Sequence, residues 1–443
     1  MLFTFYISLV KIFLFLFYET AKVLVWLVRW FYYAKRSLVN GGLRDYKGPC
    51  IVVSNHPGTL MDPLNVAVLM KRRVNFLANA GLFGNPFSNW FFSTFYCIKI
   101  ERYSDTGGKP LNNKKAFKMA ADHLTNDGCL YMAPEGGSHA GRLERQLKTG
   151  AARIALNTEE ANNFNLGLVI LPFGLNYSNP GQFRSSLMTV IGEPIKVSDF
   201  KEDWERDQIA AVRKLTAVLK ERMEALLIIA VDEEEDQLLA KAEIILQNEE
   251  GLDGSSLLAR SQKVLAKMQS RRAEQPAFYS SFKEKLESYF QKLKAVGIFD
   301  ISVTGKKKIP ILLTALAAPV FLLGYLIHFL PAYLTKKISD KLSTDPAWLP
   351  TFKVMGGLVV YPSTLVLQYW LASFCLSSFV EIENWWKWAY LASIVPAGLM
   401  AEWFIDQRAL FCSNLRFRRF AKQQPAELER LMVLRAAVLS EIL

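Results

Sequence analysis

The chain has 443 residues and a formal net charge of +12, and 51% of its residues are hydrophobic. This length allows a catalytic domain of ordinary size together with accessory helical regions. The positive charge suits an anionic membrane surface, a phosphorylated ligand or a nucleic acid. However, no RNP-like aromatic strand, zinc-finger spacing or Gly-rich nucleotide loop accompanies the charge. We therefore predict neither a nucleic-acid partner nor nucleotide hydrolysis.

The cysteines and histidines argue against a metal centre. Five cysteines are scattered along the chain without a C-x-x-C pair, and there are only four histidines. This usage is typical of a reducing compartment and does not fit a disulfide framework or structural zinc. We expect no metal and no cofactor.

Residues 1–40 form an apolar, aromatic-rich segment with lysine or arginine at positions 11, 22, 29, 35 and 36. The segment lacks the basic start and the small-residue cleavage site of a signal peptide. Cations inside such a run can reach lipid headgroups through their long side chains. The segment is therefore predicted to form one or two helices embedded in a membrane or lying on its surface.

Residues 41–200 alternate short β-rich runs with helical patterns, which indicates an α/β domain with a mostly parallel sheet. The β-rich runs are CIVVSN, FYCIKI, CLYMAP, LGLVILPFGLNY and LMTVIGEPI. The helical patterns KKAFKMAADHL and KTGAARIALN lie between them. This domain is where we expect the chemistry.

The rest of the chain is predicted to be helical. Residues 201–305 are charged with apolar residues at helical spacing, which favours a lid or scaffold over a partner-binding role. Residues 306–412 hold three apolar stretches, 309–334, 355–380 and 385–405, each about long enough to cross a bilayer. Prolines 319 and 331 leave a re-entrant form of the first stretch open. Residues 413–443 are predicted as a helical tail.

The charges around the last two apolar stretches suggest their topology. The loop EIENWWKW between them is acidic and Trp-rich, whereas the connection at 336–353 and the segment RFRRFAK are basic. Basic loops favour the cytoplasmic side, so we predict a hairpin whose tip lies outside.

The stretch NHPGTLMDP follows the strand-like run CIVVSN and contains the strongest catalytic candidates, His56 and Asp62. A neutral imidazole can take a proton from an alcohol if a carboxylate fixes its tautomer and stabilises the resulting cation. Asp62 followed by Pro63 is typical of a helix N-cap, which places His56 at a strand end and Asp62 at a helix start. Read alone, the pair also fits an ordinary turn with a capping Asp.

A second candidate segment follows the run CLYMAP and reads Glu135, Gly136, Gly137, Ser138, His139. Its glycines allow backbone N–H groups to approach an anion, and the Ser and His side chains can add donors. The segment also comes near a G-x-S-x-G nucleophile elbow, but Ala140 stands where the last glycine belongs. A serine hydrolase or transacylase acting through Ser138 is the alternative.

Three cations lie near predicted strand ends or loops: Arg102, Lys148 and Arg184. Each alone fits a solvated surface charge. Open α/β sheets bind ligands beyond the carboxyl ends of their strands, and cations there are suited to a phosphate monoester.

Four blocks resemble, in order and separation, the glycerophospholipid (PlsC-like) acyltransferase superfamily over about residues 45–200. They are NHPGTLMDP, YCIKIER with Arg102, PEGGSH, and LPFGLNY with FRS. His56 and Asp62 are separated by five residues, as in the fungal-type glycerol-3-phosphate branch, where four is usual for the superfamily. The resemblance implies that Asp62 orients His56, which deprotonates the acceptor hydroxyl for attack on an acyl thioester without an acyl-enzyme.

The same resemblance implies the binding residues and the partners. In the second block, Arg102 takes the place of the family's Arg. In the third block, Glu135 and Gly136 take the places of the Glu and Gly to which the family assigns acceptor binding. We add five further substrate-binding candidates: Gly137, Ser138, His139, Lys148 and Arg184. Expected partners are a phosphorylated glycerol, membrane lipids, and acyl-CoA or acyl carrier protein as co-substrate.

The leading hypothesis is therefore a membrane-bound O-acyltransferase of phospholipid biosynthesis acting on glycerol-3-phosphate or dihydroxyacetone phosphate. A lysophosphatidate acyltransferase and a non-enzymatic lipid-binding membrane scaffold remain the alternatives. We expect the catalytic domain on the cytoplasmic side of a bacterial inner membrane or of the endoplasmic reticulum.

Overall fold

The computed structural model describes residues 2–102, 112–252, 254–307, 309–377 and 385–443, with the side chains of 2–8, 255 and 376 left aside. The chain divides into two compact units. The first consists of Met1–Val231 with Pro346–Pro350, and the second of Asp232–Asp345 with Thr351–Leu443.

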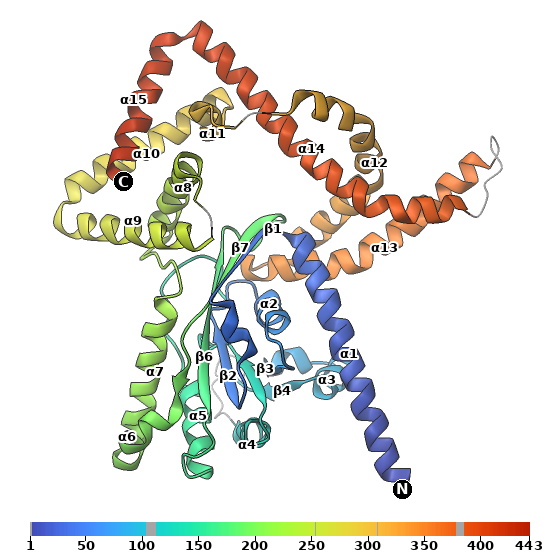
Figure 1. Cartoon of the computed structure of the whole chain (residues 1–443), viewed down its shortest axis with the longest axis vertical. Coiled ribbons are helices and arrows are strands. Elements are labelled where there is room, and N and C mark those ends of the chain that lie inside the picture. Colours follow the sequence, from blue (N-terminus) through green and yellow to red (C-terminus); the bar gives the residue numbers. More distant parts are fainter. Residues whose placement is uncertain (1, 103–111, 253, 308, 378–384) are drawn as a thin grey trace. The chain divides into compact units, whose positions relative to one another are not determined.

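The first unit is built on an eight-stranded, mostly parallel sheet (Figure 1). The strands are β1 (Tyr33–Val39), β2 (Cys50–Ser54), β3 (Asn75–Asn79), β4 (Cys97–Ile100), β5 (Cys129–Met132), β6 (Val169–Tyr177), β7 (Ser185–Ile191) and β8 (Ile195–Lys196). Their order is β1-β7-β6-β2-β5-β3-β4, with β8 paired to β6. Strands β6, β2, β5, β3 and β4 run parallel, whereas β7 pairs antiparallel with β6 and parallel with β1. The predicted α/β class is confirmed.

The central strands are apolar because both of their faces are covered. Every residue of β2 and β6 is buried. Continuous apolar runs such as these are typical of parallel sheets with helices on both sides. The five β-rich runs of the sequence correspond to β2, β4, β5, β6 and β7.

Helices of the first unit pack on both sides of the sheet. They are α1 (Leu2–Tyr32), α2 (Met61–Leu69), α3 (Pro86–Thr94), α4 (Lys114–Thr125), α5 (Gly150–Ala161), α6 (Lys201–Arg206) and α7 (Gln208–Glu224), with short 3₁₀ turns at Gly41–Asp45, Ala80–Phe83, Val197–Phe200 and Pro346–Trp348. In Figure 1, α1 and α2 lie on one side of the sheet and α5 and α7 on the other.

The core of the first unit extends beyond the boundary that we expected at residue 200. Ile51 and Val53 of β2 belong to the same buried cluster as Trp204 of α6 and Leu215 and Leu219 of α7. These apolar residues bury the outer surface of the sheet, so the two helices complete the α/β unit. The separate helical unit begins at Asp232.

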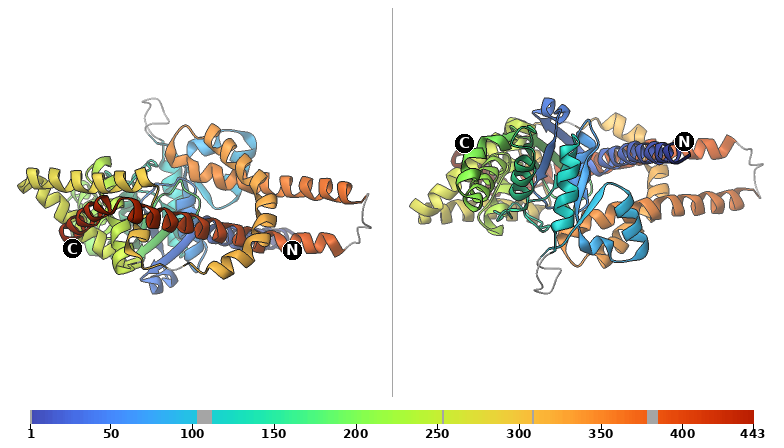
Figure 2. Two further views of the ribbon diagram at one scale, coloured as in Figure 1. Left: turned by 90° about the horizontal axis from the view of Figure 1, so that it is seen from above. Right: turned by 90° about the horizontal axis from the view of Figure 1, so that it is seen from below.

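The N-terminal segment is helical only as far as Tyr32, and Tyr33–Val39 forms strand β1 at the sheet edge. The expectation of helix over residues 1–40 is wrong for its last part, because pairing with β7 satisfies the backbone groups of these residues. Figures 1 and 2 show α1 as one continuous helix that runs directly into β1.

Aromatic side chains and hydrogen bonds fix α1 to the sheet unit. The ring centroids of Phe17 and Phe95 are 3.9 Å apart. The Tyr18 hydroxyl accepts a hydrogen bond of 3.0 Å from the Val74 backbone N–H. Lys22 donates to the Met70 carbonyl at 2.7 Å. This face of α1 therefore packs on protein, while apolar residues on its other side, including Leu16 and Val23, are exposed. Contact of α1 with a membrane remains a prediction.

The second unit is helical throughout its described residues. Its helices are α8 (Glu233–Glu250), α9 (Gly254–Glu274), α10 (Pro276–Val296), α11 (Asp300–Thr304), α12 (Ile311–Leu342), α13 (Leu349–Leu376), α14 (Trp385–Gln423) and α15 (Pro425–Ile442). The Asp300 carboxylate is buried and accepts hydrogen bonds from Tyr289, Arg435 and Asn248. This network joins α8, α10, α11 and α15.

Among the described residues, three helices are long and apolar enough to cross a membrane, at Ile311–Leu342, Pro346–Cys375 and Trp385–Gln423. The three predicted apolar stretches fall inside them. Pro319 and Pro331 lie within α12, which continues as a helix past both. The first half of the predicted hairpin tip EIENWWKW, residues 381–384, lies outside the described residues.

Close contact between α12 and α14 depends on a glycine. A Cβ added at Gly324 would lie 2.2 Å from the Ala397 carbonyl oxygen, closer than packed atoms approach, whereas a Cβ at Gly357 of α13 would meet only Thr335 at 3.9 Å. Gly324→Ala is expected to lower the apparent melting temperature in detergent by about 5 °C, because the two helices must separate. Gly357→Ala is the matched control and should melt at or above the wild-type temperature. Equal melting of both variants would contradict this account of the helix contact.

Candidate active site

A side-chain clamp fixes the chain where it leaves β2. Asn55 donates from its side-chain amide to the Leu175 carbonyl at 2.9 Å and accepts from the Leu175 N–H at 2.8 Å. This pair of hydrogen bonds continues the β2–β6 pairing beyond Ser54. His56 is thereby held at the carboxyl edge of the parallel strands, where α/β sheets bind ligands.

The carboxylate of Asp62 lies beside His56 and is fully buried. The His56 Nδ1 lies 2.9 Å from the Asp62 Oδ2. The same oxygen accepts from the Gly58 backbone N–H at 2.7 Å, and the Oδ1 accepts from the Tyr177 hydroxyl at 2.7 Å. The Asp62 carboxylate is placed to accept the Nδ1–H of the imidazole, which leaves the His56 Nε2 to act as the base.

The expected role of Asp62 as a helix N-cap is wrong. Helix α2 begins at Met61, Leu60 occupies the N-cap position, and Pro63 is the third helical residue. The helix starts earlier because the Asp62 carboxylate bonds to His56, Gly58 and Tyr177 and makes no cap bond. Proline remains acceptable at Pro63, since N–H groups of the first turn have no partner within the helix.

The Tyr177 hydroxyl extends the dyad into the core. It donates to Asp62 and accepts from the Asn65 side-chain amide at 3.1 Å, and the same amide donates to Tyr33 at 3.2 Å. Burial raises the pKa of Tyr177 well above its usual value and the adjacent Asp62 charge raises it further, so the hydroxyl remains a donor. Sequence reasoning missed Tyr177, although it is the last residue of β6 and therefore lies at the same sheet edge as His56.

The segment after β5 is folded against the His56 backbone. The His56 N–H donates to the Glu135 Oε1 at 3.3 Å, and the His139 N–H donates to the His56 carbonyl at 3.1 Å. Burial raises the pKa of Glu135 to about 7; the nearby His56 opposes this rise and the Asp62 charge adds to it. The two predicted blocks therefore meet in space.

Two glycines of this segment allow close side-chain approach. Gly136 has a φ of +74°, and a Cβ there would lie 3.1 Å from Lys148, whose N–H donates to the Pro134 carbonyl at 2.7 Å. A Cβ on Gly137 would lie 3.3 Å from the His139 Nε2. The Lys148 and His139 side chains thus converge on the backbone of the PEGGSH segment.

Ser138 does not form a catalytic pair with His56. Across the described residues, no hydrogen bond joins the Ser138 hydroxyl to the His56 ring, whose Nδ1 is bonded to Asp62. A nucleophilic serine needs such a base within hydrogen-bond reach. The arrangement favours direct transfer over the Ser138 alternative.

The remaining predicted cations lie on opposite sides of the dyad. Arg102 follows β4, three strand positions from β2, or about 14 Å at the usual strand spacing. Arg184 precedes β7 on the other side, with a φ of +64°, and its N–H donates to the Tyr32 carbonyl at 2.7 Å. Both are half-buried.

Metal ligands are lacking in the part of the chain that the structure describes: no group of three or more His, Cys, Asp or Glu side chains is arranged to hold an ion. The expectation of a reaction without a cofactor remains a prediction.

Residues 32–176, which carry the dyad and the PEGGSH segment, match the family model described as Acyltransferase. This part of the chain is an acyltransferase domain. Two relatives from Saccharomyces cerevisiae are similar to part of the chain: glycerol-3-phosphate O-acyltransferase 2, 32% identical over 108 residues, and glycerol-3-phosphate O-acyltransferase 1, 33% identical over 81 residues. The alignments cover 24% and 18% of this chain, and only 14% and 10% of those proteins.

One solved structure is distantly similar to the chain. It is the crystal structure of the 1-acyl-sn-glycerophosphate (LPA) acyltransferase PlsC from Thermotoga maritima, 19% identical, with a TM-score of 0.34. The match covers 50% of this chain and 88% of the other.

Tyr177 is expected to position Asp62 without touching substrate. Tyr177→Phe removes one hydrogen bond to a buried carboxylate, so kcat for acyl transfer should fall about 10- to 100-fold while both KM values stay unchanged. The matched control is Tyr131→Phe, which removes an equally buried hydroxyl that bonds to Ser54 and not to Asp62. A fall in kcat of equal size in both variants would show that the loss is structural.

Glu135 is expected to make stability depend on pH. Its folded-state pKa of about 7 lies above the ordinary glutamate value, so folding favours the protonated form. Stability is therefore lost as pH rises from about 4.5 to 7, by an amount on the order of 1–3 kcal/mol. Glu135→Gln keeps an acceptor for His56 but cannot ionise. Its melting temperature relative to wild type should rise across this window and level off above pH 7; a constant difference would contradict the assignment.

Proposed function

We propose that the chain transfers a fatty acyl group from an acyl thioester to a hydroxyl of sn-glycerol 3-phosphate. The observation that carries the proposal is the 2.9 Å contact between the His56 Nδ1 and the buried Asp62 carboxylate. This contact leaves the His56 Nε2 as a base at the carboxyl edge of the sheet.

In the proposed reaction the His56 Nε2 takes the proton of the acceptor hydroxyl. The hydroxyl oxygen attacks the thioester carbonyl, a C–O bond forms, and the C–S bond breaks. The thiolate that leaves takes the proton back from His56. Asp62 stabilises the imidazolium during the transfer, and no acyl-enzyme forms.

The choice of acceptor rests on the five-residue separation of His56 and Asp62 and on the similarity to two glycerol-3-phosphate O-acyltransferases. Dihydroxyacetone phosphate has the same phosphate and a comparable hydroxyl and belongs to the same acceptor class. Lysophosphatidate is the competing acceptor, and Arg102, Glu135, Gly136, Gly137, Ser138, His139, Lys148 and Arg184 are the proposed substrate-binding residues.

The proposed donor is acyl-CoA or an acyl carrier protein, and the proposed setting is a membrane of phospholipid synthesis with the catalytic domain on the cytoplasmic side. Support comes from the three apolar helices and from the excess of basic residues. A lipid-binding scaffold is the non-enzymatic rival, and it would not require a carboxylate buried against the His56 ring.

An acceptor panel tests the proposal. Detergent-purified protein is given one acyl donor with glycerol 3-phosphate, dihydroxyacetone phosphate, lysophosphatidate or unphosphorylated glycerol. We expect turnover with glycerol 3-phosphate and none with glycerol. His56→Ala should lower kcat by about 10²- to 10⁴-fold without lowering the melting temperature by more than a few degrees.

Four outcomes would overturn the proposal. Faster turnover of lysophosphatidate than of glycerol 3-phosphate would identify the protein as a lysophosphatidate acyltransferase. Full activity in His56→Ala, or labelling of Ser138 by a covalent serine probe, would exclude the base mechanism. If no phosphorylated glycerol is acylated, the non-enzymatic alternative, a lipid-binding membrane scaffold, is favoured.

A further inference from the structure

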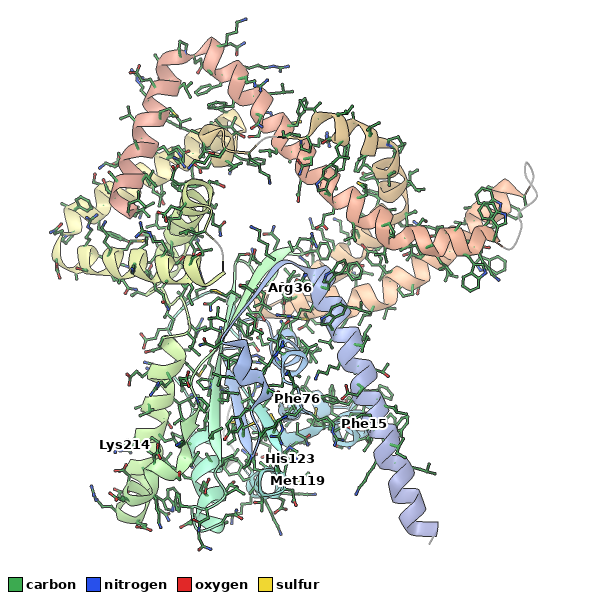
Figure 3. The ribbon with its side chains drawn as sticks, viewed as in Figure 1. Phe15, Arg36, Phe76, Met119, His123 and Lys214 are labelled. Carbon is green, nitrogen blue, oxygen red and sulfur yellow. The ribbon has the colours of Figure 1, made fainter. Side chains whose placement is uncertain are left out.

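A chain of aromatic rings joins α1 to α3, the short helix between β3 and β4. The ring centroids of Phe13 and Phe95 are 6.3 Å apart, and those of Phe95 and Trp90 are 6.2 Å apart. The Trp90 and Phe87 centroids follow at 5.9 Å. Figure 3 labels Phe15 on the stretch of α1 that passes α3. Side chains from two distant parts of the sequence therefore form one continuous aromatic surface.

The outer members of this surface are exposed to solvent. Phe87 is 70% exposed and Trp90 is 56% exposed. On α1, four exposed apolar side chains at positions i, i+3, i+4 and i+7 continue the surface: Leu9, Ile12, Phe13 and Leu16. We call these six side chains the α1–α3 surface. Soluble monomers seldom leave a contiguous apolar patch uncovered, and such patches mark contact with a partner or a membrane.

The charge around the α1–α3 surface is positive. Residues 63–100, which contain α3, include four lysines or arginines and no Asp or Glu. Helix α1 has one acidic residue and three basic ones. The guanidinium of the exposed Arg73 lies 5.8 Å from the centroid of the Phe15 ring, so a cation stands directly beside the apolar side chains of α1.

This charge favours one occupant over the others. A second copy of the chain would bring the same cations face to face, and like charges across an interface are unfavourable. A leaflet of anionic phospholipids presents negative headgroups around an apolar interior, which matches apolar side chains bordered by cations. Tryptophan, as at Trp90, is also enriched where proteins meet lipid headgroups.

The fold suits entry into one leaflet and not a crossing. Helix α3 has nine residues, about 14 Å in length, whereas the hydrocarbon core of a bilayer is roughly 30 Å thick. Lipid cannot surround α1, because one side of this helix is bonded to protein. Tyr18 accepts from the Val74 N–H, and Lys22 donates to the Met70 carbonyl.

The α1–α3 surface belongs to the same unit as the dyad and begins at the same edge of the sheet. Strand β3 ends at Asn79, on the carboxyl edge, and the turn Ala80–Phe83 leads from it into α3. β3 lies two strand positions from β2, or about 10 Å at the usual strand spacing. His56 follows β2. A membrane that contacts the start of α3 therefore lies beside the edge that holds His56.

We propose that the α1–α3 surface binds the headgroup region of an anionic phospholipid leaflet. The inference goes beyond the proposed acyl transfer, since lipid contact here requires no catalysis and is additional to the three long apolar helices. None of the four sequence blocks includes α3. Bound in this way, the surface holds the carboxyl edge of the sheet at the lipid, and a molecule with an acyl chain reaches His56 without leaving the membrane surface.

Photocrosslinking tests the contact directly. The photoreactive residue p-benzoylphenylalanine replaces Phe87 or Trp90 in the full chain, which is reconstituted in phosphatidylcholine vesicles with or without phosphatidylglycerol. The matched control carries the same residue at Ile209, which is 67% exposed on α7, on the other side of the sheet from α1 (Figure 1). We expect phospholipid adducts at Phe87 and Trp90 at about tenfold higher yield than at Ile209, and more adduct with phosphatidylglycerol.

Three results of this experiment would overturn the proposal. A crosslink to a peptide, from a second copy or from another part of the same chain, would assign the α1–α3 surface to protein contact. Equal lipid labelling at Ile209 would make the contact non-specific. Absence of any adduct at both Phe87 and Trp90 would mean that the surface faces water.

Kinetics test whether the surface serves acyl transfer. Phe87→Ser combined with Trp90→Ser should leave kcat/KM unchanged in detergent and lower it about 5- to 10-fold in vesicles that contain phosphatidylglycerol. Ile209→Ser should match the wild type in both. Full activity in vesicles, or an equal loss in detergent, would contradict this role. If the wild type transfers no acyl group, the proposed function fails, and the crosslinks still decide whether the surface binds lipid.

Discussion

The buried carboxylate of Asp62 is the constraint on which the rest of the site depends. An ionised group without solvent contact is stable only if hydrogen-bond donors surround it. The three donors come from different parts of the chain: the His56 ring after β2, the Gly58 backbone in the loop, and the Tyr177 hydroxyl at the end of β6. Satisfying this one charge therefore fixes the loop, the start of α2 and the relative position of two strands.

The two flanks of the dyad differ in chemistry. On the β5 side, the PEGGSH segment offers backbone groups and the buried Glu135, bonded to the His56 N–H. On the β7 and β1 side, the buried Asn65 amide joins the Tyr177 and Tyr33 hydroxyls. The antiparallel turn at β7 is what places β1, and with it the end of α1, beside the carboxyl end of β6. A purely parallel sheet would have put these residues at the opposite edge.

Patterns of neighbouring residues in the sequence predict the central strands of the sheet and the pairing of His56 with Asp62. Strands β2 and β6 are continuous apolar runs, and His56 and Asp62 are close enough in sequence for their pairing to be recognised. Strand β1 was missed because its residues YAKRSLV follow an apolar helix without a turn signal. The Asp62–Tyr177 bond joins residues 115 positions apart, and no periodicity reports such a contact. Arg29 was read as a membrane-surface cation, because only the fold shows which face of α1 it occupies.

The direct passage from α1 into β1 couples the rotation of a helix to the geometry of a binding site. Tyr32 ends the helix and Tyr33 begins the strand, so no loop absorbs a change in length between them. One residue inserted before Tyr33 would turn the helix by about 100° relative to the sheet. The aromatic face of α1, which includes Phe17, would then leave Phe91 of α3. The number of residues at this junction is therefore as much a part of the site as their identity.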